Sequence, residues 1–165
     1  MGQRINDKVV GNSFITTAMA SYEKRTWWSR HELTDRLKDD NFLEAAVTCA
    51  FLVAASDGNQ SEQEYDALLD RLEILGGIDR DKIDELLTAA SNDVEAHGFE
   101  PRIARVADLL GSNKSGAEAA LMLGLAIALA DDDFSKEERE VANQLSAALG
   151  LGLLALDSLV ADIRG

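Results

Sequence analysis

The sequence predicts an all-α protein, a compact bundle of about seven to eight helices built from two repeated helical hairpins. Apolar residues make up 46% of the 165 residues and proline occurs once, so long helices and a sizeable core are both expected. Apolar side chains recur at helical spacing, and no segment shows the alternation typical of a strand. A pattern of helix, acidic turn and helix occurs twice, 74 positions apart.

The two copies of this repeat share both residue types and spacing. The first contains, in order, Glu44-Ala45-Ala46, an apolar stretch, an acidic segment over 57–64 and Leu75-Gly76. The second contains, in the same order, Glu118-Ala119-Ala120, an apolar stretch, an acidic segment over 131–138 and Leu149-Gly150. We therefore expect internal repeats at about 41–77 and 115–151, packed about a pseudo-two-fold axis.

The N-terminal part of the chain is predicted to form a mobile arm followed by a first helix. Residues 1–20 show weak periodicity, which indicates a partly mobile arm before a single helical domain over 21–165. A first helix is expected over 21–38, with Trp28 and Leu37 as its apolar anchors.

The next predicted helix is almost wholly apolar. Asn41 is a suitable N-cap for a helix that continues through Ala55, and Glu44 three residues later completes a capping-box-like pattern. Because apolar side chains surround this helix, we expect it in the centre of the bundle. It contains the single cysteine, Cys49, which predicts a buried thiol and excludes a disulfide framework.

Two amphipathic helices are predicted in the middle of the chain. The first ends at Gly76-Gly77 with a glycine cap, and the second begins at Asp79 and either frays around Ser91-Asn92 or ends near Gly98. Both carry apolar stripes at i, i+3, i+4 and i+7. These stripes are Tyr65, Leu68, Leu69 and Leu72 in the first helix, and Ile83, Leu86, Leu87 and Ala90 in the second.

The C-terminal part is predicted to contain the second repeat and two further helices. Pro101 suits the first turn of a short helix that ends at Leu110, and residues 111–116 are expected to form a loop. The second repeat is expected to consist of a helix to about Ala130, the acidic turn, and a helix over 135–149. A last helix is predicted from residue 153 to about residue 163.

Charge and composition exclude several classes of function. The formal net charge of −14 repels phosphate backbones and attracts cations and basic protein surfaces, so nucleic-acid binding is not expected. The longest apolar run, 119–130, is shorter than the roughly 20 residues that span a bilayer, and no signal peptide is evident, so we expect a cytoplasmic protein. The sequence has no glycine-rich phosphate loop, no nucleophile elbow and only two isolated histidines, His31 and His97, so an enzyme is not expected.

Each acidic turn carries an aspartate and, seven residues later, a glutamate: Asp57 and Glu64 in the first turn, Asp131 and Glu138 in the second. The glutamates also complete Ser-x-x-Glu capping boxes, which explains them without a ligand. The aspartates are expected at the C-terminal end of a helix, where the helix dipole disfavours a carboxylate. A hard cation such as Ca²⁺, Mg²⁺ or Mn²⁺ shared between the turns would compensate them, although neither turn has the glycine and glutamate that an EF-hand requires.

The stretch from Asn41 through Ser56-Asp57-Gly58, and its echo ending at Ala130-Asp131-Asp132, resembles the tellurite-resistance protein TerB family over about residues 41–155. The resemblance implies an all-helical, duplicated, non-enzymatic stress-response protein that binds divalent metal and acts with other tellurium-resistance proteins at the inner membrane face. By motif, its metal-binding positions correspond to Asp57, Glu64, Asp131 and Glu138, with Glu62, Asp133 and Glu137 as weaker candidates. The second turn departs from the pattern, because Asp132 stands where the first turn has Gly58.

An alternative function remains open at this point. The same acidic helical scaffold suits a protein that uses its acidic face to bind a basic partner without any metal. Binding that persists in a chelator and weakens with salt would distinguish this alternative from metal binding.

Overall fold

The structure is a computed structural model that describes residues 35–56, 62–76, 78–111, 113–128, 135–151, 156–157 and 160–161. Six helices lie in these ranges and no strand does, which confirms the all-α prediction for the described part of the chain. They are α3 (Asp40–Ala54), α4 (Glu62–Gly76), α5 (Arg80–His97), α6 (Glu100–Leu110), α7 (Lys114–Ala128) and α8 (Lys136–Ala148). The predicted arm over 1–20, Trp28 and His31 lie outside the described residues, whereas the second predicted anchor, Leu37, is buried.

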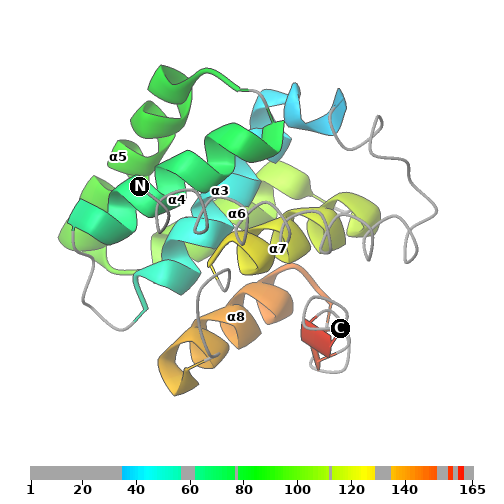
Figure 1. Cartoon of the computed structure of the whole chain (residues 1–165). Coiled ribbons are helices and arrows are strands. Elements are labelled where there is room, and N and C mark those ends of the chain that lie inside the picture. The colour runs from blue at the N-terminus through cyan, green and yellow to red at the C-terminus, as the bar shows by residue number, and fades with distance from the viewer. Residues whose placement is uncertain are drawn as a thin grey trace.

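Helices α3 and α7 form the centre of the bundle, with the other helices packed around them (Figure 1). Each has 15 residues, of which 11 are buried. The prediction of a central apolar helix is therefore confirmed for α3. Cys49 lies fully buried on α3, and the lack of water around its sulfur raises the pKa of the thiol to about 12.

The backbones of α3 and α7 approach each other closely at Gly124. A Cβ atom at this position would lie 2.6 Å from Cys49 Cβ and 2.9 Å from the backbone nitrogen of Ala50. Only glycine fits such a gap without moving one of the helices. Gly124 and Ala50 are equivalent positions of the repeat, so the two copies cross at matching residues, as a pseudo-two-fold arrangement requires.

The starts of the central helices follow the repeat. The first residue of α7 lies 74 positions after the first residue of α3. The residues before α3 and α7 are also equivalent: Asp39 accepts a hydrogen bond from the amide of Asn41, and Asn113 accepts one from the amide of Gly116. The duplication therefore includes the caps of the central helices as well as the helices themselves.

These caps correct two predictions. Asn41 is not the N-cap of α3, because Asp39 caps the helix two residues earlier and Glu44 does not return to the cap. The predicted loop over 111–116 is too long, since α7 begins at Lys114 once Asn113 supplies its first acceptor. In both cases the side chain at position 39 or 113 satisfies an otherwise unpaired backbone N–H of the first turn.

The surrounding helices bury the predicted stripes. Leu68, Leu69 and Leu72 of α4 are buried and Tyr65 is half-buried against the core, while α5 buries Ile83, Leu87 and Ala90 and half-buries Leu86. Helix α5 continues without fraying to His97 and ends at Gly98, whose φ of 82° suits glycine. Of the predicted last helix, Leu156 and Val160 are buried.

Candidate functional site

The predicted metal-binding residues are only partly described. Glu138 is half-buried and Glu137 is exposed, both in the first turn of α8. Glu62 and Glu64 belong to the first turn of α4, but their side chains lie outside the described part of the structure, as do Asp57, Asp131 and Asp133. Within the described residues, no three acidic, histidine or cysteine side chains lie close enough together to hold a metal ion.

The described half of the second turn performs the capping role expected from its sequence. Ser135 Oγ accepts a hydrogen bond from the Glu138 amide at 3.1 Å, and Glu138 Oε1 accepts one from the Ser135 amide at 2.9 Å. These reciprocal bonds form a complete capping box at the start of α8. They occupy one of the two carboxylate oxygens of Glu138, so a local helix cap accounts for this residue without a metal.

Helix α3 ends before the first of the two repeated aspartates. Its last residue is Ala54, three positions before Asp57 in the sequence. The prediction that an aspartate closes the helix is therefore wrong for α3, whose C-cap is Ala55. For the second copy the prediction is not tested, because residues 129–134 lie outside the described part of the structure. Near the last described residue of α7, Arg71 Nη1 of α4 donates to the carbonyl of Ile127 at 3.3 Å.

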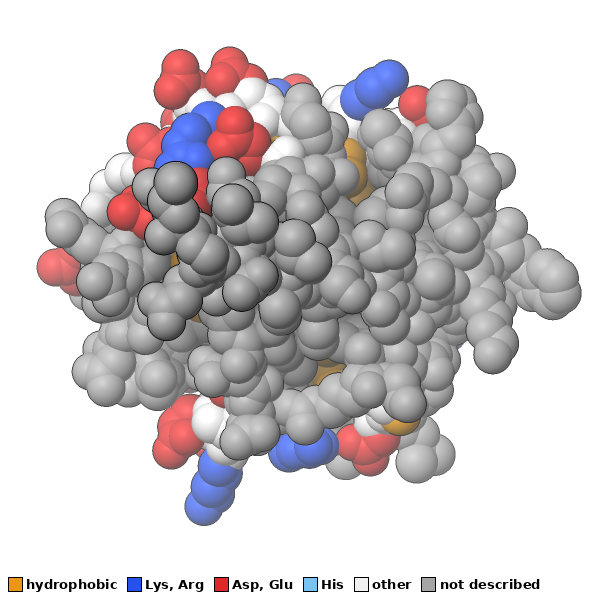
Figure 2. Space-filling view, in the orientation of Figure 1, with side chains coloured by type: hydrophobic (Ala, Val, Ile, Leu, Met, Phe, Trp, Pro, Cys, Tyr) orange, Lys and Arg blue, Asp and Glu red, His pale blue; other side chains and the backbone are white. Residues whose placement is uncertain are grey.

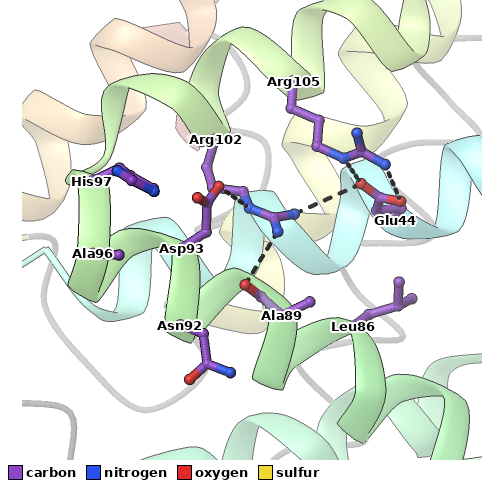
Figure 3. Close-up of a pocket in the computed structure, with 9 residues that line it drawn as sticks. All are labelled: Glu44, Leu86, Ala89, Asn92, Asp93, Ala96, His97, Arg102 and Arg105. Carbon is purple, nitrogen blue, oxygen red and sulfur yellow. Dashed lines mark hydrogen bonds and ion pairs between the residues drawn. The ribbon is translucent and has the colours of Figure 1, made fainter.

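A second candidate site is a cleft of about 460 Å³ between α5, α6 and the start of α3 (Figure 3). Its volume lies in the range of about 300–1,000 Å³ that is usual for small-molecule sites. Part of its wall is apolar and comes from one stripe of α5: Leu86, Ala89 and Ala96. Its polar residues are Glu44, Asn92, Asp93, His97, Arg102 and Arg105.

Four of the polar residues form an alternating chain of charges. Arg102 Nε donates to Asp93 at 2.7 Å, and its Nη1 lies 3.8 Å from Glu44 Oε2. Arg105 donates to the same Glu44 carboxylate through Nε and through Nη2, the latter at 3.1 Å (Figure 3). Two guanidinium groups therefore lie on the Glu44 carboxylate. The bidentate hydrogen bonds from Arg105 to Glu44 raise the pKa of Arg105 above its ordinary value.

The two arginines differ in exposure and in the number of their partners. The Arg102 side chain is 12% exposed and also donates to the Ala89 carbonyl at 3.1 Å. The Arg105 side chain is 53% exposed, and its described partner is Glu44, itself only 16% exposed. Arg102 therefore links α3, α5 and α6, whereas Arg105 binds Glu44 at the solvent-exposed end of the chain of charges.

The sequence analysis missed this cleft. Its arginines lie about 60 positions from Glu44, and no short motif connects them. One signal was available: Glu44 is the only charged residue between positions 41 and 56, and an acid inside an apolar helix requires a partner. Because the sequence analysis assigned Glu44 to a capping box, it did not look for a charged partner.

The hairpin of α4 and α5 carries most of the net negative charge. Residues 62–97 contain 11 acidic and three basic side chains, against a net charge of −14 for the whole chain. All three basic residues are engaged: Arg71 with the Ile127 carbonyl, Arg80 with Asp70 and Glu73, and Lys82 with Asp40. Figure 2 shows acidic side chains gathered at the upper left, where α5 lies in Figure 1.

These features define a small, duplicated, all-helical protein with a strongly acidic hairpin. Among known families, the model described as "Tellurite resistance protein TerB" matches residues 43–159, most of the chain. The chain therefore belongs to the TerB family, as the resemblance of the acidic turns predicted. No curated protein and no solved structure matched it. None of the described helices combines the length and hydropathy needed to cross a membrane.

Proposed function

We propose that this chain is a non-enzymatic stress-response protein of the tellurite-resistance system, which binds divalent metal ions through its acidic inter-helix turns and acts with partner proteins. Other tellurium-resistance proteins at the inner face of the membrane are the partners that this role implies. Ca²⁺, Mg²⁺ and Mn²⁺ are the candidate ions, because carboxylate oxygens suit hard cations. The proposal places the protein in the cytoplasm.

The observation that carries the metal proposal is the repeated aspartate. Asp57 and Asp131 follow helices α3 and α7 in the sequence, and the first residues of these helices are related by the same offset of 74 positions. A duplicated acid at equivalent positions suits a ligand set drawn from both copies. The glutamates support the proposal less strongly, because the capping box of α8 already gives Glu138 a local role.

Isothermal titration with Ca²⁺, Mg²⁺ and Mn²⁺ tests this proposal on the full chain. The wild type is expected to bind at least one ion saturably, and the double variant Asp57→Asn, Asp131→Asn is expected to lose that binding. A matched control is Asp66→Asn, Asp81→Asn, which removes the same charge from exposed positions on α4 and α5 and should bind as the wild type does. Equal binding by the wild type and the Asp57/Asp131 double variant would exclude these aspartates as ligands.

Glu138 needs a separate experiment, because it takes part in a cap. Glutamine retains an oxygen that can accept from the Ser135 amide, so Glu138→Gln should keep the thermal stability of the wild type. A loss of metal affinity at unchanged stability would therefore add Glu138 to the ligand set. Unchanged affinity would limit its role to capping.

The charge of the α4–α5 hairpin favours a second candidate function, a metal-independent scaffold for a basic protein partner. The three basic residues of this hairpin are already paired within the protein, and the acidic residues exceed them in number. The hairpin therefore keeps a net negative charge that attracts basic protein surfaces. A partner captured by the full chain should then stay bound in a chelator and dissociate as salt rises. Loss of the partner in the chelator alone would support the metal-dependent function instead.

A further inference from the structure

The cleft between α5 and α6 contains hydrogen-bonding groups that the fold does not use. Arg105 Nη1, the Asn92 amide and the His97 ring make no hydrogen bond with any described residue. Asn92 and His97 are exposed and line the same cleft as Arg105 (Figure 3). The apolar stripe of α5 lies beside these groups, so the cleft combines polar groups with an apolar wall, as small-molecule sites do.

The ion chain allows Arg105 to change partners at low cost. Removing every cation from a largely buried carboxylate is strongly unfavourable, because the charge is then left without compensation. Glu44 has two guanidinium partners, however, and the buried one, Arg102, is held in place by Asp93 and the Ala89 carbonyl. Arg105 can therefore turn toward a ligand while Arg102 continues to compensate Glu44.

We propose that this cleft binds a small organic anion, whose carboxylate or phosphate group takes the place of Glu44 on the planar fork of Arg105 and whose apolar body lies against Leu86 and Ala89. Arginine matches such oxyanions with two parallel N–H donors. Asn92 supplies a further donor at the rim. Distant carboxylates do not prevent this, because at physiological ionic strength charges more than about 8 Å away are largely screened. The nearby carboxylates of Glu44 and Asp93 remain paired with Arg102.

Titrations of the full chain with benzoate and with inorganic phosphate, followed by amide chemical shifts and by calorimetry, test the proposal. Benzoate carries the anionic group on an apolar ring, and phosphate carries the anionic group alone. Benzoate is expected to bind saturably, with shifts at Ala89, Asn92 and Arg105, and more tightly than phosphate. Phosphate binding as tight as that of benzoate would overturn the role of the apolar wall, and saturation by neither would overturn the proposal as a whole.

Three variants locate the site. Arg105→Gln should weaken benzoate binding about tenfold or more, since a charged bidentate contact is lost. Arg139→Gln removes an arginine of similar exposure on α8, 47% against 53%, and should leave the affinity unchanged. Ala89→Phe adds a ring at an exposed position of the wall and should block the cleft while every charge remains. Wild-type affinity in both Arg105→Gln and Ala89→Phe would refute the site.

Discussion

Gly124 provides the most direct test of how the two repeats pack. Gly124→Ala adds a Cβ atom that would lie 2.6 Å from Cys49 Cβ and 2.9 Å from the Ala50 nitrogen. Carbon atoms pack at about 3.5–4.0 Å, so the first contact is short by roughly 1 Å. The Ala50 nitrogen belongs to the backbone, and the new methyl group can therefore be accommodated only if α3 and α7 move apart.

The size of the effect follows from two opposing terms. Overpacking a core costs about 1–3 kcal/mol, whereas alanine gains about 1 kcal/mol over glycine in a helix interior. The backbone clash favours the upper part of the first range, so we expect a net loss of about 1–2 kcal/mol in the free energy of unfolding. For a chain of this size, that corresponds to a fall in Tm of roughly 2–8 °C.

Urea unfolding followed by far-UV circular dichroism measures this loss, with Gly116→Ala as the matched control. Gly116 lies in the same helix, but its added Cβ would meet the ends of two side chains, Asn113 Nδ2 at 3.0 Å and Arg36 Nη1 at 3.2 Å. Side-chain ends can shift more easily than backbone, although moving Asn113 weakens its cap on the Gly116 amide, so the control should lose less stability than Gly124→Ala. A Gly124→Ala protein as stable as the wild type, with an unchanged m-value, would refute the close approach of α3 and α7.

Three further predictions concern stability and reactivity. Arg102→Met should destabilise the fold by about 3 kcal/mol and Arg105→Met by about 1 kcal/mol or less, because only the first change removes the buried link between α3 and α5; equal losses in urea unfolding would contradict this ranking. Burial raises the pKa of Cys49 to about 12, so the native thiol should resist a disulfide reagent at neutral pH and react after unfolding; rapid native labelling would show that α3 is not central. Burial, and then the hydrogen bond to Asp84, raise the pKa of Tyr65 in the folded state. Its neutral form therefore stabilises the fold below the ordinary pKa near 10, and this contribution disappears as the pH rises through the folded pKa. Wild-type stability should accordingly fall more steeply above pH about 10 than that of Tyr65→Phe, and parallel pH profiles would remove this role from Tyr65.

The structure separates the glutamates of the acidic turns from the aspartates as candidate metal ligands. The capping box gives Glu138 a local role that requires no metal. The aspartates at positions 57 and 131 keep their repeated spacing and remain the residues on which metal binding depends. Their substitution, rather than that of the glutamates, therefore gives the most informative titration.

Much of the fold follows from the sequence because its signals are local. Apolar side chains around an entire helix require a central position, which placed Cys49 and its neighbours correctly. Caps such as Asp79 and Ser135 act within three residues of their own position, so their residue types predicted where α5 and α8 begin. The duplication was evident for the same reason, since both copies repeat the same local signals.

Tertiary packing decided the remaining features. Glu44 could have returned to its own helix start but instead pairs with arginines of α6, because folding brings α6 against α3. The sequence by itself therefore determined the helices, their repeat and the family. Only the tertiary structure decided the crossing at Gly124 and the cleft around Arg105, since both depend on which distant segments share the same space.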